Sequence, residues 1–353
     1  MKKPRGIGIV GVGGIALHHL PAYRARGFRV VAGHDVNPGV FDRIRREFGV
    51  KHLTTNLAEF LSTPGLDVVD IAIPHYLELR RPVVAAAARA GKAIFCQKPS
   101  DESFGGALAL VRIAEKAGVP YAVNHNSSFV PGFVVAERMF RDRRRFGRPF
   151  WFQIENRGSL WFSKHPHWGS RRRWILAGMA VHHIGLAHHW FGSPKRVWAT
   201  LVKDPTKPFI KAENIATIAL EYASGLKGLI INNWSYTGPK HRPHPREEIV
   251  VLGTKGSLTF DSKEVSFDSA GNRKVTRVKG RWFNDAFGES MRAFLRGLDG
   301  GPKYPFMGRE DLKIMAVVVA AYRSAALGRA VNPAEIAGRE INPHYSRSLP
   351  LRE

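Results

Sequence analysis

The sequence predicts an α/β protein, with a doubly wound parallel sheet followed by an α+β domain built on a mostly antiparallel sheet. In the first part of the chain, short apolar runs that suit strands alternate with segments that suit helices, as in successive βαβ units. After Gly147, strand-like runs separated by Gly, Asn, Asp or Pro predominate instead. The 353 residues are enough for two domains. We expect these over residues 1–124 and 125–330, with an extended tail over 331–353.

The turn after the first predicted strand has the spacing Gly-x-Gly-x-x-Ala, at Gly11, Gly13 and Ala16. Gly11 permits a tight turn, Gly13 lets the backbone approach a pyrophosphate, and a small residue at position 16 lets the next helix lie close to the strand. The first N–H groups of that helix, from Gly14 and Ile15 onward, would point at the phosphates. The turn therefore predicts a dinucleotide-binding Rossmann domain.

An acidic residue follows the second predicted strand. Asp35 ends the apolar run that begins at Phe28, close to the spacing of about 20 residues expected for a ribose-binding acid. A carboxylate there accepts hydrogen bonds from the adenosine ribose hydroxyls and repels a 2′-phosphate. We therefore predict NAD as the cofactor, in preference to NADP.

The remaining elements of the first domain follow the same alternation. We expect helices over 40–48, 56–62, 81–90 and 103–117, and strands over 53–55, 68–73, 93–96 and 121–124. Ligands of such sheets bind at the carboxyl ends of the strands. The residues at these strand ends are Ile73, Pro74 and His75, then Gln97 and Lys98, then Asn124 to Asn126.

In the second domain we expect strands over 150–156, 196–202, 215–222, 226–234, 248–252, 257–260 and 274–278. Helices are predicted over 175–190, 285–298 and 309–327. From residue 332 the chain is rich in Pro and Arg, which indicates an extended tail.

Composition limits the partners and the compartment. The net charge is +25, but the excess arginine is spread along the chain, so we interpret it as a solvated basic surface and expect no nucleic-acid partner. No apolar run reaches the ~18 residues of a membrane span. A single cysteine, Cys96, fits a reducing cytoplasm.

With the glycine turn, Asp35, and Gln97-Lys98-Pro99 in place, the chain resembles the glucose–fructose oxidoreductase, inositol dehydrogenase and MocA (Gfo/Idh/MocA) family over nearly its whole length. The resemblance implies a Rossmann domain followed by an α/β domain with a large open sheet. It also implies hydride transfer between NAD(P) and a carbinol or carbonyl of a sugar, polyol or related ring. A homodimer or homotetramer that packs through the open sheet is implied as well.

The resemblance extends to single residues, with three departures, at Gln97, at Gly185 and at His188, where the family often has an arginine. The family's Glu-Lys-Pro signature matches as Gln97-Lys98-Pro99, with an amide in place of the carboxylate. The family's asparagine matches Asn126, and its catalytic histidine matches His182. The aspartate that follows three residues later in the family is Gly185 here.

Oxidation of a carbinol requires a base for the hydroxyl proton and a donor on the oxygen. We expect His182 as the base, with His183 as its rival, and Lys98 on the substrate oxygen. Since Gln97 is neutral, we expect Lys98 to titrate lower than beside a glutamate. Trp168 is a candidate for stacking on a sugar ring. The predicted cofactor-binding residues are Gly11, Gly13, Gly14, Ile15, Asp35, Ile73, Pro74, His75, Gln97, Lys98 and Asn126; the predicted substrate-binding residues are Lys98, Asn126, Trp168, His182 and His183.

Several alternatives stay open at this point. The histidines at 165, 167, 182 and 183 have no recognised metal-ligand spacing, so we expect no metal. The basic residues 171–173 and 240–242 leave open an anionic group on the substrate. The losses at Gln97 and Gly185 would also suit a dinucleotide-binding regulator, or a redox-neutral lyase in which bound NAD oxidises and re-reduces the same carbon.

Overall fold

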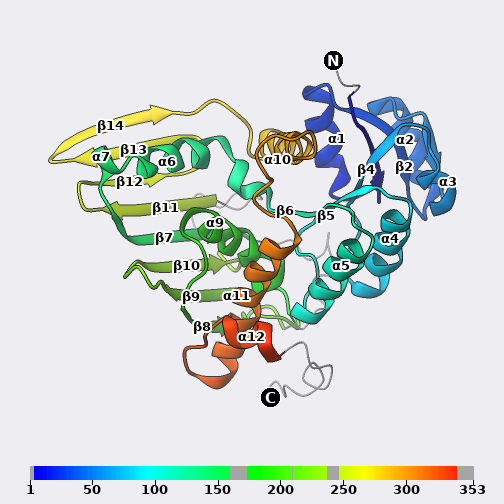
Figure 1. The fold of residues 1–353 in the computed structure, drawn as a ribbon. Helices are drawn as coiled ribbons and strands as arrows, with labels where there is room; N and C mark the ends of the chain where they lie inside the picture. The colour runs from blue at the N-terminus through cyan, green and yellow to red at the C-terminus, as the bar shows by residue number, and fades with distance from the viewer. Residues whose placement is uncertain (1–3, 160–172, 209, 237–245, 340–353) are drawn as a thin grey trace. The chain divides into compact units, whose positions relative to one another are not determined.

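The computed structural model describes residues 4–159, 173–208, 210–236 and 246–339. The chain forms two compact units (Figure 1). The first combines Met1–Phe129 with Arg281–Leu312, and the second combines Val130–Gly280 with Lys313–Glu353. Because Arg281–Leu312 returns to the first unit, the two units are not two consecutive stretches of the sequence.

The first unit contains a six-stranded parallel sheet in the order β3-β2-β1-β4-β5-β6. Its strands are β1 (Gly6–Val10), β2 (Arg29–His34), β3 (His52–Thr54), β4 (Leu66–Ile71), β5 (Ala93–Gln97) and β6 (Tyr121–Asn124). Strands β1 and β5 are buried along their whole length, as expected of a parallel sheet covered on both faces. The predicted doubly wound sheet is thus confirmed, although β4 ends two residues earlier than expected, at Ile71.

The helices of this unit connect successive strands. They are α1 (Ala16–Ala25), α2 (Phe41–Phe48), α3 (Leu57–Leu61), α4 (Leu77–Arg89) and α5 (Phe104–Lys116), with 3-10 turns at Pro38–Val40 and Asn126–Phe129. Asn56 caps α3, because its side-chain oxygen accepts hydrogen bonds from the N–H groups of Ala58 and Glu59. Ser103 caps α5 in the same way, through the N–H of Gly106.

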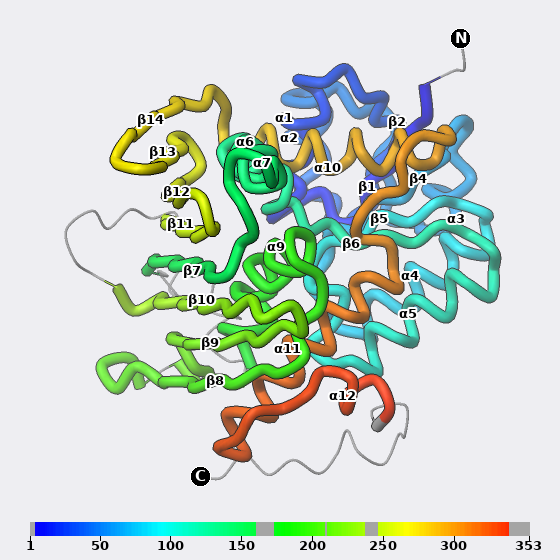
Figure 2. The backbone as a smooth tube through the Cα atoms, turned by 60° about the vertical axis from the view of Figure 1, so that its left-hand side comes forward, coloured from blue at the N-terminus to red at the C-terminus, as the bar shows by residue number. Residues whose placement is uncertain are grey.

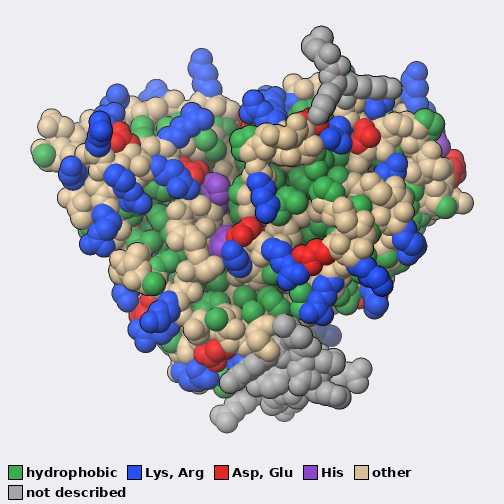
Figure 3. Space-filling view, viewed as in Figure 1, with side chains coloured by type: hydrophobic (Ala, Val, Ile, Leu, Met, Phe, Trp, Pro, Cys, Tyr) green, Lys and Arg blue, Asp and Glu red, His purple; other side chains and the backbone are tan. Residues whose placement is uncertain are grey.

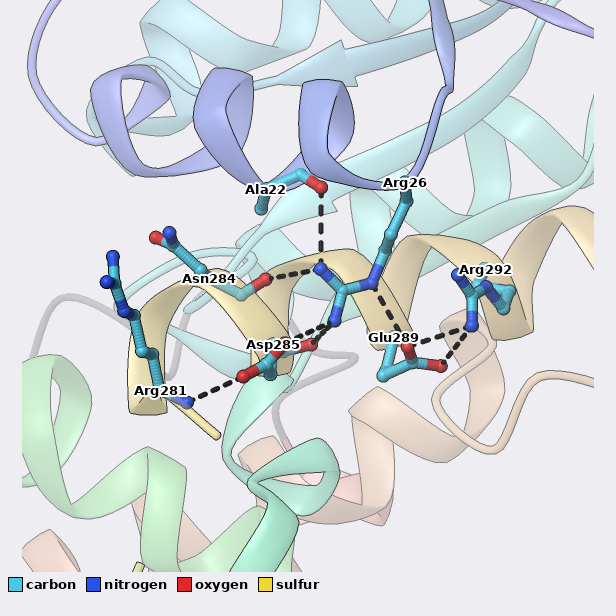
Figure 4. A network of polar contacts seen from close by, with 7 residues as sticks. All are labelled: Ala22, Arg26, Arg281, Asn284, Asp285, Glu289 and Arg292. Atoms are coloured by element: carbon cyan, nitrogen blue, oxygen red, sulfur yellow. Dashed lines mark hydrogen bonds and ion pairs between the residues drawn. The ribbon is translucent and has the colours of Figure 1, made fainter. Parts of the chain in front are cut away.

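Helix α10 (Trp282–Leu298) is held to α1 by one buried arginine (Figure 4). Arg26 Nη2 donates to Asp285 Oδ1 at 2.8 Å, and Arg26 Nε donates to Glu289 Oε1 at 3.0 Å. Its Nη1 also donates to the main-chain oxygen of Asn284 at 3.0 Å. Gly288 lies against this guanidinium, since a Cβ at that position would be 2.3 Å from Arg26 Nε. Arg26 therefore fastens the segment 281–312 to the beginning of the chain.

The second unit contains an eight-stranded sheet in the order β14-β13-β12-β11-β7-β10-β9-β8 (Figure 2). Its strands are β7 (Pro149–Arg157), β8 (Arg196–Val202), β9 (Ile215–Glu221), β10 (Lys227–Asn233), β11 (Arg246–Gly253), β12 (Gly256–Phe260), β13 (Glu264–Ser269) and β14 (Asn272–Arg277). All neighbouring pairs are antiparallel except β7 with β10. Burial alternates along β9, β10 and β11, so one face of the sheet is covered and the other is more exposed.

The helices of the second unit are α6 (Pro131–Arg141), α7 (Arg143–Phe146), a π-helix (Ile175–Ala180), α9 (Val181–Phe191) and α12 (Ala334–Arg339). Helix α11 (Gly308–Leu327) begins in the first unit and continues into the second. Helix α6 and strand β13 were absent from the sequence prediction. Phe133, Ala136 and Phe140 are buried in α6 at helical spacing, which is a signal that the sequence contains.

The prediction of an extended tail over 331–353 is wrong where the structure describes it. Val331 pairs with Val197, and Ala334–Arg339 form α12. The side-chain oxygen of Asn332 accepts a hydrogen bond from the N–H of Ala334 at 3.0 Å, so a local cap starts the helix. Residues 340–353 lie outside the described residues.

Basic side chains are spread over the protein surface. On the face shown in Figure 3, the Lys and Arg side chains are scattered among hydrophobic and other polar groups. Among the helices that the structure describes, we find none with both the length and the apolar character needed to cross a membrane.

We predict that Gly288→Ala acts through Arg26. The added methyl group must displace the guanidinium, so we expect the free energy of unfolding to fall by about 1–2 kcal/mol, as for Arg26→Ala. In Arg26→Ala/Gly288→Ala the second substitution should add little further loss, because the displaced group is gone. Urea denaturation of the three variants measures this, and additive losses would contradict it.

Candidate functional site

The turn between β1 and α1 leaves a backbone cradle. Gly11 has φ +85°, its N–H donates to the main-chain oxygen of His34 at 2.7 Å, and a Cβ would meet Ile73 Cγ2 at 2.7 Å. A Cβ at Gly13 or Gly14 would meet nothing within 4 Å. Helix α1 begins without a side-chain cap at Ile15 and without an acidic residue in its first turn. The open backbone and the uncapped helix N-terminus fit a pyrophosphate.

Asp35 follows β2 and is half-buried. Its Oδ2 accepts a hydrogen bond from the N–H of Val12 at 3.0 Å, and its Oδ1 accepts one from the N–H of Asn37 at 3.0 Å. The carboxylate is therefore tied to the glycine turn, with acceptor capacity left on both oxygens. This is the arrangement that a ribose diol needs, and it fits NAD.

The other predicted cofactor-binding residues lie at the same carboxyl edge of the sheet. Ile73, Pro74 and His75 follow β4, and His75 Nε2 lies 3.3 Å from Glu102 Oε1 in the loop after β5. Gln97 is the last residue of β5 and is buried.

Asn126 follows β6 and is fully buried, and neither side-chain oxygen nor nitrogen has a partner among the described residues. An amide without partners in the interior is costly unless a ligand or water satisfies it. Asn126 is therefore available to a cofactor or a substrate.

Lys98 is half-buried directly after β5, and the Lys98–Pro99 peptide bond is cis. Burial, and then the positive charge of Arg80, lower the pKa of the Lys98 amine to about 7. The sequence predicted a lowered pKa from the neutrality of Gln97. The structure gives two other causes for the lowered pKa, desolvation and a neighbouring cation.

Arg80 is a residue of the site that the sequence analysis missed. Its Nη1 donates to the main-chain oxygens of Gln97 at 2.7 Å and Ser100 at 3.1 Å, and to that of Pro99. Its Nη2 donates to the main-chain oxygen of Ile73 at 2.9 Å. One guanidinium thus joins the ends of β4 and β5. The signal was present, because position 80 lies on the buried stripe of α4 that continues through Val83, Val84, Ala87 and Ala88.

Asp311, in the first turn of α11, was also missed. Its carboxylate accepts a hydrogen bond from Ser100 Oγ at 2.5 Å and lies 2.8 Å from His125 Nε2. All three side chains are fully buried. Asp311 thus joins the loop after Lys98 to the segment that carries Asn126, and no spacing in the sequence indicates this contact.

The second unit holds the two candidate histidines at the start of α9. His183 is buried, and its Nε2 lies 3.7 Å from Glu247 Oε1 in β11. Asn156 in β7 donates to the same oxygen at 3.5 Å and accepts a hydrogen bond from the indole of Trp234 at 2.7 Å. His182 is half-buried on the same helix turn. The two rings therefore have different surroundings, and His183 faces a carboxylate that the sequence analysis did not anticipate.

Several residues that the sequence analysis singled out are not part of the described structure. Trp168, His165, His167 and the basic residues 171, 172 and 240–242 lie outside the described residues. Gly185, where the family pattern has an aspartate, is buried inside α9. Within residues 4–159, 173–208, 210–236 and 246–339, no group of three His, Cys, Asp or Glu side chains is arranged to hold a metal ion.

Comparisons with known proteins identify the family to which both domains belong. Residues 5–125 match the sequence family described as "Oxidoreductase family, NAD-binding Rossmann fold", and residues 137–259 match the "GFO/IDH/MocA C-terminal domain". The chain is 30% identical over 337 residues to a D-apiose dehydrogenase of Paraburkholderia graminis. This alignment covers 92% of this chain and 88% of that protein. It is 26% identical to an inositol 2-dehydrogenase of Rhizobium meliloti, with 92% and 98% covered.

A solved structure has the same fold. The oxidoreductase from Agrobacterium radiobacter, in complex with NAD+, L-tartaric acid and magnesium, superposes with a TM-score of 0.85 at 23% identity. The alignment covers 95% of this chain and 100% of that chain. The predicted fold class is confirmed over both units.

We predict that Arg80→Met loosens the strand ends that carry Lys98. Loss of the guanidinium leaves buried carbonyls without donors, so we expect a loss of about 2–4 kcal/mol in stability and roughly tenfold in NADH affinity. The pKa of Lys98 should rise, because a neighbouring positive charge is removed. Thermal denaturation and NADH fluorescence titration measure the two losses. The matched control is Arg81→Met, which changes an exposed arginine of the same helix; equal behaviour of the two variants would contradict the role of Arg80.

Proposed function

We propose, on the premise that this chain belongs to the Gfo/Idh/MocA family of oxidoreductases, that it is an NAD-dependent dehydrogenase of a sugar or polyol. Its Rossmann domain is of the NAD-binding kind. The names of its relatives, D-apiose dehydrogenase and inositol 2-dehydrogenase, support a polyhydroxylated substrate whose CH–OH group is oxidised or formed by reduction.

The observation that carries the proposal is the grouping at one sheet edge of a pyrophosphate cradle, a ribose-binding acid and a lysine. The turn at Gly11 and Gly13, the tethered Asp35 and the half-buried Lys98 all belong to the first unit. The carboxylate of Asp35 favours the 2′-hydroxyl of NAD over the 2′-phosphate of NADP.

In this proposal Lys98 and His182 both act on the carbinol group of the substrate, each in a different role. NAD, when bound, supplies the hydride acceptor. Lys98 donates a hydrogen bond to the substrate oxygen, and its lowered pKa lets it exchange a proton near neutral pH. His182 takes the hydroxyl proton as the C–H bond gives up its hydride, and it returns the proton when a carbonyl is reduced. We assign the base to His182 because His183 is buried against Glu247. Asn126, with its unpartnered amide, is proposed to bind the ligands of this site.

A second candidate function rests on the two lost carboxylates. Gln97 and Gly185 replace acidic residues of the family pattern, which favours either a redox-neutral lyase that uses bound NAD or a regulator that binds the dinucleotide. The lyase would convert substrate without net formation of NADH. The regulator would bind NADH and convert no polyol.

The test of the dehydrogenase is binding followed by turnover. We expect NAD and NADH to raise the melting temperature more than NADP and NADPH, and a panel of aldoses and inositols to give NADH by absorbance. Asp35→Ser should reduce the preference for NADH over NADPH by at least about tenfold, because it removes the charge that repels a 2′-phosphate.

Asp42→Ser is the control for the loss of a carboxylate, since Asp42 lies on the surface of α2 with its side chain 88% exposed. If the protein binds NADH but no member of the panel reduces NAD to NADH, the proposal of a dehydrogenase is refuted. An unchanged preference in Asp35→Ser would refute the role of Asp35.

We also propose that the chain self-associates through the more exposed face of the eight-stranded sheet. Trp198 in β8 is 42% exposed and pairs with Ala219, which in turn pairs with Leu229. Val202, near the end of the same strand, is 48% exposed. Trp198 and Val202 are large apolar side chains left exposed on this face, and an interface there would bury them.

Light scattering should therefore give twice or four times the chain mass of 39.3 kDa. Trp198→Glu should shift the protein toward monomer, since it places a charge in the apolar face. Leu327→Glu, an equally exposed apolar position at the end of α11, should leave the mass unchanged. A monomeric wild-type protein would contradict the proposal.

A further inference from the structure

A buried chain of hydrogen bonds ends at the peptide group of Lys98. Asp70 in β4, His19 in α1 and Gln97 at the end of β5 are all buried. His19 Nδ1 lies 2.7 Å from Asp70 Oδ2, and His19 Nε2 lies 3.0 Å from Gln97 Nε2. Gln97 Oε1 accepts the main-chain N–H of Lys98 at 2.8 Å. Tyr23 also donates its hydroxyl to Asp70 Oδ2, at 2.7 Å.

The direction of every bond in this chain is fixed by its two ends. The N–H of Lys98 can only donate, so the side-chain oxygen of Gln97 must face it and the NH₂ group must face His19. His19 Nε2 is then an acceptor. The remaining ring proton sits on Nδ1 and is donated to the carboxylate of Asp70. All donors of the chain then point toward Asp70.

We propose that Asp70 and His19 are positioning residues for Lys98, and that they act through Gln97 only because residue 97 is an uncharged amide. This rests on the proposed function in one respect, that Lys98 acts on the substrate oxygen. The amide is required because position 97 must donate to His19 and accept from Lys98 at once. Gln97 stands where the family has a glutamate, and a carboxylate lies instead at Asp70, two hydrogen bonds away from Gln97.

The chain can be reversed by exchanging the two groups. In Gln97→Glu alone, two buried carboxylates flank one ring, so His19 takes up a proton and donates to both of them. In Asp70→Asn alone, the acceptor of the His19 proton is weakened. In Asp70→Asn/Gln97→Glu, the new amide can donate to Nδ1, and His19 can donate from Nε2 to the new carboxylate. The hydrogen bonds among residues 70, 19 and 97 are then restored in the opposite direction, whereas the Tyr23 hydroxyl loses its acceptor at position 70.

The experiment is this cycle of four proteins, measured without substrate. In the wild-type protein, ¹⁵N NMR of the histidine side chains should give the Nδ1–H tautomer for His19, and in the double variant the Nε2–H tautomer. Each single variant should melt about 3–6 °C lower, because Gln97→Glu buries a second charge beside the ring and Asp70→Asn weakens the acceptor of the Nδ1 proton. The double variant should recover more than half of the summed loss.

A second measurement separates positioning from structural support. The measurement is the pH at which Lys98 reacts half-maximally with an amine-acylating reagent, read by peptide mass spectrometry. This pH should rise by about one unit in the double variant, because the negative charge has moved next to Lys98. Asp67→Asn is the control, since Asp67 lies in the same strand but accepts from the N–H of Gly6, outside this chain. It should leave the tautomer of His19 and the titration of Lys98 unchanged.

The outcomes are distinct from those that decide the proposed function. An Nε2–H tautomer or an imidazolium in the wild-type protein would overturn the inference, and so would additive losses in the double variant. Rescue of the melting temperature with no shift in the reactivity of Lys98 would reduce the chain to structural support and would also overturn it. Failure to oxidise any polyol would instead refute the dehydrogenase, since none of these readouts requires turnover.

Discussion

The buried guanidinium of Arg80 is the interaction on which the carboxyl edge of the first sheet depends. Main-chain carbonyls at the ends of β4 and β5 have lost their strand partners, and they are buried, so each needs a donor. One planar group with several N–H donors satisfies those of Ile73, Gln97 and Ser100 together. The same positive charge lies close enough to Lys98 to lower its pKa. Structural support and the chemistry of the site therefore come from one side chain.

Buried polar groups organise the second unit in a similar way. Strands β7 and β11 place Asn156 and Glu247 opposite each other on the covered face of the sheet, where apolar residues would be expected. Trp234, directly after β10, and His183 in α9 complete this group. A carboxylate in such surroundings is stabilised only by its hydrogen-bonding neighbours. Of the two histidines at the start of α9, His183 is the one whose ring lies near Glu247 among the described contacts.

Much of the fold could be predicted, because its signals are local. The glycine turn, the alternation of apolar runs and the caps at Asn56 and Ser103 each involve residues close in the sequence. The family resemblance is confirmed by the matches to both domains. The helix of α12 was missed because the composition of the tail was given more weight than the single capping residue Asn332.

The sequence by itself determined the Rossmann turn and placed Asp35 and Lys98 at the ends of the second and fifth strands. These depend on spacing along the chain, which is visible in one dimension. Only the tertiary structure decided the partners of those residues. Arg80 and Asp311 bind groups that are 7 to 211 positions away. The polarity of the Asp70–His19–Gln97 chain arises only when α1, β4 and β5 pack together. Such contacts are selected by the need to satisfy every buried donor and acceptor, and that need exists only in the folded interior.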